Sequence, residues 1–90
     1  MSEGAPPPLI SYPTHYTFKA MGLAGPELKA RILAHVRAVL GAVEESSITV
    51  RPSSAGKYES VSVHVYLTSE DERRRIYEAF HGDKTIVWYV

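Results

Sequence analysis

The sequence predicts an α+β sandwich in which a four-stranded antiparallel sheet is covered on one face by two helices. Residues 60–67 alternate strictly between polar and apolar side chains, as a strand with one buried face does. Residues 26–43 and 69–80 space their apolar side chains three or four positions apart, which is typical of helices that pack on such a face. A chain of 90 residues suits one domain with a single core.

The first strand and the first helix follow from local signals. Residues 15–21 are predicted to form a strand whose inner face consists of Tyr16, Phe18 and Ala20. Gly25 can serve as the N-cap of the helix, and Pro26 suits its first position because an N–H there has no helical partner. The helix then presents one apolar stripe, made of Leu28, Ile32, Val36, Val39 and Val43, and it is expected to fray near Gly41 while Val43 still packs.

The second and third strands are predicted to form a hairpin. Residues 47–52 form a strand at the edge of the sheet, because Pro52 cannot donate a ladder hydrogen bond. Residues 53–57 form the polar turn, in which Gly56 takes a positive φ. The third strand buries one set of alternate side chains, namely Val61, Val63, Val65 and Leu67.

The second helix begins at Ser69, whose spacing to Glu72 fits a capping box. It ends near Phe80, and Gly82 is expected to close it in the left-handed conformation. Residues 86–90 are predicted to form the last strand.

The order of elements is therefore β-α-β-β-α-β. Right-handed crossovers and one apolar face per element predict a ferredoxin-like sandwich. We expect residues 12–90 to form this single domain. Residues 1–11 contain three consecutive prolines, and we expect them to form a flexible arm.

Composition disfavours several classes of protein. Ten basic and ten acidic residues give a formal net charge of zero, so an overall basic footprint for nucleic acid or an anionic membrane is missing. The chain has no cysteine, which excludes disulfides and fits a reducing compartment. No apolar run approaches the ~20 residues of a membrane span, and no secretory signal is recognised. We therefore expect a cytoplasmic domain without membrane contact.

Several segments together resemble the YbeD-like family of small bacterial proteins of unknown function. They are residues 12–22 (YPTHYTFKAMG), 51–54 (RPSS), 56–58 (GKY), 60–63 (SVSV) and the pair Ile76-Tyr77. The resemblance spans residues 12–90. It implies a ferredoxin-like fold close to that of ACT domains, which are small regulatory modules that bind amino acids and other metabolites. A regulatory role in binding a small metabolite or a protein partner is the function that the resemblance implies.

Two places are candidates for ligand binding. The loop of residues 21–26 precedes a helix, and helix N-termini attract anions through unpaired N–H groups. Gly56-Lys57 invites comparison with a phosphate-binding loop, but Arg51 stands where that motif needs glycine, and Tyr58 where it needs Ser or Thr. A weak anion cradle on the hairpin is what remains. The candidate ligand-binding residues are Lys19, Gly22, Gly25, Arg51, Lys57 and Tyr58.

An enzyme is not expected. The four histidines, which are His15, His35, His64 and His81, have no metal-ligand spacing and no cysteine beside them, so no metal or cofactor is predicted. No serine lies in a nucleophile motif, so no catalytic residue is proposed.

The uncovered face of the sheet offers two alternative functions. Lys19, Arg51, His64 and Tyr66 are expected to lie there, and the last strand is expected to add either Val87 and Tyr89, of which Tyr89 is the candidate, or their neighbours. RNA-recognition domains of the same topology stack bases on such aromatic residues, but serine and valine replace most of the stacking rings here. Self-association into a homodimer or an adaptor, through this face or the edge that carries Pro52, is the other alternative.

Overall fold

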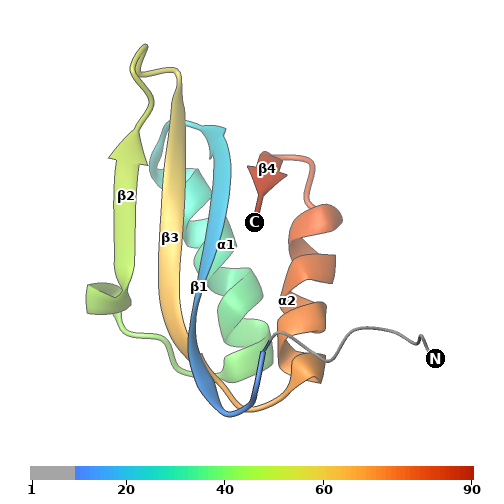
Figure 1. Cartoon of the computed structure of the whole chain (residues 1–90). Helices are drawn as coiled ribbons and strands as arrows, with labels where there is room; N and C mark the ends of the chain where they lie inside the picture. Colours follow the sequence, from blue (N-terminus) through green and yellow to red (C-terminus); the bar gives the residue numbers. More distant parts are fainter. Residues whose placement is uncertain (1–9) are drawn as a thin grey trace, which may run out of the picture.

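The computed structural model describes residues 10–90 and has the predicted ferredoxin-like architecture (Figure 1). Residues 1–9, most of the predicted arm, lie outside the described part. The elements in chain order are β1 (Thr14–Leu23), α1 (Pro26–Leu40), the 3₁₀ turn η1 (Glu45–Ser47), β2 (Ile48–Pro52), β3 (Tyr58–Leu67), α2 (Glu70–His81) and β4 (Ile86–Tyr89). The four strands pair in the order β2-β3-β1-β4, and every pairing is antiparallel.

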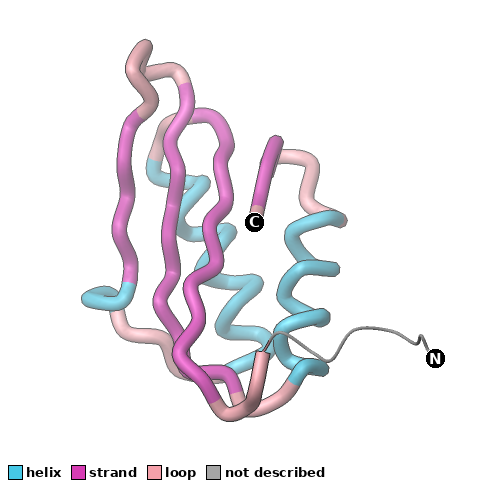
Figure 2. The backbone as a smooth tube through the Cα atoms, viewed as in Figure 1, coloured by secondary structure: helices cyan, strands magenta, loops and turns pink. Residues whose placement is uncertain are grey.

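The two helices lie on the same side of the sheet, as Figures 1 and 2 show. The central strands β1 and β3 pair over ten residues, from Thr14 opposite Leu67 to Leu23 opposite Tyr58. Their inner faces meet the helices in one core, and the predicted inward residues of β1, β3 and α1 belong to it or pack against it. The buried core consists of Phe18, Ala20, Leu28, Ile32, Val36, Val61, Val63, Leu67, Ile76, Phe80 and Ile86.

The helix termini follow the predicted chemistry with one exception. Gly25, at φ +145°, precedes α1, and the Ser69 hydroxyl accepts a hydrogen bond from the Glu72 N–H at 3.2 Å before α2. The prediction that Gly82 closes α2 in the left-handed conformation is wrong, since its φ is −81° and its ψ is −4°. The Gly82 N–H still bonds to the Glu78 carbonyl at 3.0 Å, which is the ordinary hydrogen bond of a continuing helix.

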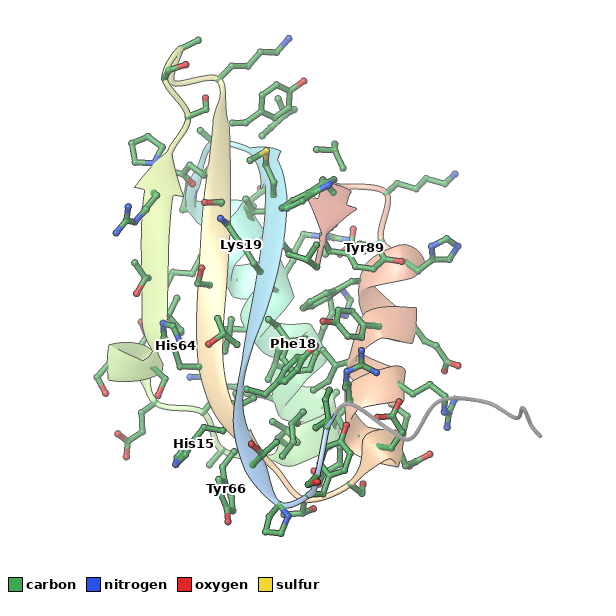
Figure 3. All side chains as sticks on the ribbon, viewed as in Figure 1. His15, Phe18, Lys19, His64, Tyr66 and Tyr89 are labelled. Atoms are coloured by element: carbon green, nitrogen blue, oxygen red, sulfur yellow. The ribbon has the colours of Figure 1, made fainter. Side chains whose placement is uncertain are left out.

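The last strand is short and irregular, which turns Tyr89 away from its predicted position. Tyr89 lies opposite the buried Ala20 and Trp88 opposite Met21, and the pairing then shifts register before Gly22. The Tyr89 ring therefore packs on the helix side, 6.1 Å from that of Phe80, and Figure 3 shows both Phe18 and Tyr89 on that side. Trp88, rather than Tyr89, is the aromatic residue of β4 with a largely exposed side chain.

The short β4 leaves part of β1 without a strand beside it, and Arg73 of α2 covers the core there. Its guanidinium carbon lies 5.6 Å from the ring centre of Tyr16 and 5.1 Å from that of Tyr77. Arg73 Nε also donates to the Tyr16 hydroxyl at 3.2 Å, and the two tyrosine hydroxyls are 2.8 Å apart. Burial, followed by the hydrogen bond with Tyr16, raises the pKa of Tyr77, so the Tyr77 hydroxyl stays protonated beside Arg73.

Gly22 is a position of close approach, which gives a first prediction. A Cβ at this position would overlap the Thr85 carbonyl oxygen and would lie 2.7 Å from Leu28 Cδ1. Gly22→Ala is therefore expected to lower the free energy of unfolding by about 2–3 kcal/mol, as overpacking does. Urea unfolding followed by circular dichroism measures this.

Gly82→Ala is the matched control. A Cβ there would meet nothing closer than 3.5 Å, and the backbone conformation is ordinary for any residue. We expect a change within about 0.5 kcal/mol. Equal destabilisation by the two substitutions would contradict the assignment of Gly22 to close packing.

Candidate functional site

A hollow of about 560 Å³ opens beside the loop between β1 and α1. Its walls are residues 23–28, Arg31 on the next turn of α1, and the segment around Lys84 and Thr85 that leads into β4. The hollow therefore lies where the start of α1 meets the connection between α2 and β4. Its size is that of a small-molecule site.

A buried carboxylate organises one wall of this hollow. Asp83 is only 5% exposed, and it accepts hydrogen bonds from Arg31 Nε at 3.1 Å and Arg31 Nη2 at 3.0 Å. It also accepts from the Thr85 N–H at 2.9 Å and the Thr85 hydroxyl at 2.6 Å. His35 Nε2 lies 2.7 Å from Asp83 Oδ2. Asp83 thus joins α1 to the connection between α2 and β4.

Asp83 is ionised because its hydrogen bonds outweigh its burial. Burial by itself would raise the pKa of this carboxyl, but the hydrogen bonds from Arg31, Thr85 and His35 hold the pKa well below its ordinary range. The charge is balanced by the Arg31 guanidinium, which is bound in the two-pronged geometry that suits a carboxylate. Arg31 is consequently held in one orientation at the wall of the hollow.

The loop between β1 and α1 is held from the other side by the β2–β3 hairpin. The Ala24 N–H donates to the Lys57 carbonyl at 2.9 Å, and the Gly25 N–H donates to Glu59 Oε1 at 3.3 Å. The hairpin and the Asp83 contacts thus fix the hollow from two directions.

The hollow combines an apolar lining with charges at its wall. Leu23, Leu28 and Val87 contribute the apolar surface. Arg31 and Lys84 contribute positive charge, and Glu27 contributes one negative charge. Lys84 forms no ion pair with any residue between 10 and 90. Such a surface suits a small molecule that carries an anionic group and an apolar part.

The predicted ligand-binding residues do not form one site. Gly25 lines the hollow, and Gly22 packs behind it against Leu28 and Thr85. Lys57 holds the β1–α1 loop through its backbone carbonyl, but its side chain does not line the hollow. The Lys57 Nζ lies instead 5.5 Å from the ring centre of Tyr58. Tyr58 is paired with Leu23 at the end of the sheet.

The other two predicted residues lie on strands beyond the walls of the hollow. Lys19 is paired with Ser62, and Arg51 with Ser60, so both alternate onto the uncovered face of the sheet. Neither of them lines the hollow.

Sequence reasoning missed Arg31, Asp83, Lys84 and Thr85. One local signal was present, because Asp83 stands two residues before Thr85, which is the spacing at which an aspartate side chain bonds the backbone of a turn. The bond to Arg31 joins residues 52 positions apart, and no local pattern indicates it.

A second hollow, of about 620 Å³, lies on the uncovered face of the sheet. His64 and Tyr66 lie there as predicted, together with His15, and Figure 3 shows all three away from the helices. Thr17 Oγ1 is 2.8 Å from His64 Nδ1, and the His15 and Tyr66 rings meet edge to face with centres 5.0 Å apart.

Two classes of site have no counterpart in the part of the chain that the structure describes. Within residues 10–90, no three His, Asp or Glu side chains are grouped so that they could hold a metal ion. No helix in the same range is long and apolar enough to cross a membrane.

The Asp83 contacts give a second prediction. Asp83→Asn is expected to lower the free energy of unfolding by about 2 kcal/mol at neutral pH, because it removes the charge that strengthens the buried hydrogen bonds of Asp83 to Arg31, Thr85 and His35. Since the folded pKa of Asp83 lies below the unfolded one, its stabilisation is present above about pH 4 and is lost as the pH falls. The difference between the parent and the variant should therefore shrink in acid.

Urea unfolding across a series of pH values tests this. Asp71→Asn, which removes an exposed helical ion pair, is the control and should cost less than about 1 kcal/mol. A cost of Asp83→Asn that stays constant from neutral pH to acid would contradict the role given to the charge.

Comparisons with known proteins establish the family of the chain. A family model described as "Protein of unknown function (DUF493)" matches residues 7–90. A UPF0250 protein of Cronobacter sakazakii is 38% identical over 79 residues, which are 88% of this chain and 87% of that protein. The UPF0250 protein YbeD of Salmonella arizonae is 39% identical over 70 residues, which are 78% of each chain.

A solved structure shows the same fold. The solution structure of protein HP0495 from H. pylori superposes with a TM-score of 0.77 at 15% identity, and it covers all of this chain and 94% of that one. The resemblance that residues 12–90 show to the YbeD-like proteins is thus confirmed. The chain belongs to the DUF493 family, a family of unknown function that includes the UPF0250 proteins named YbeD.

Proposed function

We propose that this chain is a non-enzymatic, ACT-like regulatory domain of the cytoplasm that binds a small metabolite in the hollow beside the β1–α1 loop. One observation carries the proposal. The hollow has a guanidinium held in place at its wall, because the buried Asp83 binds Arg31, and Lys84, which forms no ion pair with residues 10–90, lines the hollow beside it. A fixed cation needs little reorganisation to meet an anionic ligand, which favours binding.

The chemistry of the lining favours a compact ligand with an anionic group. Arg31 uses two of its N–H groups on Asp83, and its remaining donors are left for another acceptor. Lys84 offers a second positive charge within the same hollow. Leu23 and Leu28 provide apolar surface for the rest of the molecule.

We propose binding rather than catalysis because the side chains that line the hollow include few groups able to act as a nucleophile or a base. The described residues that line the hollow include no histidine, serine or cysteine, and Glu27 is the one carboxylate among them. Nucleophile and base pairs of the usual kinds are therefore missing from this lining. A ligand that bridged Arg31 and Lys84 would add a second link between α1 and the segment before β4, beside the one that Asp83 makes.

The proposal predicts that a small carboxylate stabilises the protein. In a thermal-shift screen of amino acids and small carboxylic acids, at least one member should raise the Tm by about 6–11 °C at ten times its Kd. Lys84→Ala should weaken the binding of that member about tenfold, because it removes one charge-assisted contact.

Lys29→Ala is the matched control. Lys29 lies near the start of α1, as the lining residues Leu28 and Arg31 do, but it pairs with Glu45 and does not line the hollow. Its Kd for the ligand should match that of the parent. Absence of a shift from every member of the panel, or equal weakening by the two substitutions, would contradict the proposal.

One observation favours a second candidate function, the binding of single-stranded RNA on the uncovered sheet face. The Tyr66 side chain is 53% exposed and lies beside His15 in the hollow on that face. An exposed ring on a β-sheet can stack a base. The net charge of zero weighs against it, because contacts with phosphates supply much of the affinity for RNA.

Fluorescence anisotropy with mixed-sequence oligonucleotides at low ionic strength separates the two functions. RNA binding on this face predicts a salt-dependent signal that Tyr66→Ala weakens about tenfold, since stacking is worth about 1–3 kcal/mol per base. Tyr58→Ala, at the far end of β3, is the control. No signal at low salt excludes the RNA function and leaves the metabolite site untouched.

A further inference from the structure

Exposed apolar side chains gather at β4 and at the end of β1 beside it. Six large hydrophobic side chains of residues 10–90 are well exposed, and four of them lie together here. They are Leu23 (60% exposed), Val87 (58%), Trp88 (48%) and Val90 (54%), and we call them the β4 patch. Exposed apolar residues that are scattered singly need no explanation, whereas a group of them on one strand indicates an interface.

The two edges of the sheet are built differently. The β2 edge carries Arg51 and ends at Pro52, and a charge and a proline are devices that prevent unwanted strand pairing. Residues 86–90 contain neither a charge nor a proline. An uncharged, apolar edge strand of this kind attracts another strand, so this edge is the one that is suited to a partner.

The backbone of β4 is available for pairing on its outer side. The Val90 N–H and carbonyl both bond to Lys19 of β1, at 2.8 and 3.1 Å. Because successive residues of a strand turn these groups to opposite sides, those of Tyr89 point away from β1. Within the described residues, no strand pairs with this side of β4, which lies at the margin of the sheet in Figure 1.

The charges beside the β4 patch indicate what kind of partner fits. Helix α2 flanks β4, and Arg74, Glu78 and Tyr89 border one shallow hollow between them. Arg74 and Glu78 lie one turn apart, are both largely exposed and form an ion pair with each other at 2.6 Å, and Arg74 also pairs with Asp71. A second α2 that runs antiparallel around a two-fold axis would place each of these exposed ion pairs beside its own copy with the charges reversed, so that two pairs join into a network of four alternating charges. A surface of this kind complements itself.

We propose that two copies of this chain associate through β4, with the β4 patches in contact around a two-fold axis. The apolar patch matches its own copy, the α2 charges alternate in sign as self-pairing requires, and the zero net charge of the chain adds no overall repulsion. A strongly acidic or basic partner would find no such match. This interface lies at the edge opposite the β2 edge expected from the sequence, and through Trp88 and Val90 it includes the border of the open face.

The full chain is its own probe, because Trp88 is the single tryptophan. Between about 1 µM and about 1 mM, sedimentation should show the mass rising from 10.0 kDa toward twice that value. Over the same range the tryptophan emission should move to shorter wavelength as Trp88 is buried. A mass of one chain throughout would overturn the proposal.

A pair of matched substitutions locates the interface. Val87→Lys places a charge in the β4 patch and should weaken association at least about tenfold, as an unpaired charge at an interface does. Val50→Lys places the same charge on the opposite edge, where Val50 is 38% exposed, and should leave association unchanged. Equal effects of the two, or a stronger effect of Val50→Lys, would overturn the proposal. If Val87→Lys does not unfold cooperatively and so is not properly folded, Val90→Lys takes its place. The emission shift of Trp88 in the parent chain still tests whether the chain associates.

Discussion

The fixed geometry of the hollow depends on one buried charge. Asp83 is almost fully buried, and a buried carboxylate is costly unless its charge is balanced and its oxygens accept hydrogen bonds. Arg31, His35 and Thr85 meet that requirement from two separate parts of the chain. Asp83 therefore joins the first helix to the connection into β4. Without its partners on both of these segments, the burial of its charge would be unfavourable. The position of Arg31 at the wall of the hollow follows from this contact.

The sequence predicts those parts of the fold that arise from local periodicity. Alternation over residues 60–67 locates the buried face of β3, because successive side chains of a strand point to opposite faces. The start of α2 is likewise local, since Ser69 and Glu72 stand three residues apart and cap the helix themselves. Because each strand and helix has one apolar face to bury, the elements pack into a sheet covered by two helices on one side.

The features that sequence reasoning missed depend on contacts between distant residues. Tyr89 packs toward the helices because the β1–β4 pairing changes register beside Gly22, and alternation within β4 alone cannot reveal such a change. Arg31 and Asp83 find each other across 52 positions. Lys19 and Arg51 alternate onto the uncovered face, as the strand pattern predicts, so these two candidate binding residues cannot share a site with Gly25, which lies at the hollow. Leu23 and Val87 belong both to the hollow and to the β4 patch, so a ligand and a second copy of the chain would meet at shared residues.

The most direct test of the central claim, that the hollow beside the β1–α1 loop is the binding site, is a residue-resolved one. Amide chemical shifts of the full chain, recorded by heteronuclear NMR while metabolite mixtures are added, report where a ligand contacts the protein. The account predicts that the largest shifts occur at Gly25, Arg31 and Thr85, on the two walls that Asp83 joins. Shifts confined to Thr17 and His64 on the uncovered sheet face would contradict it.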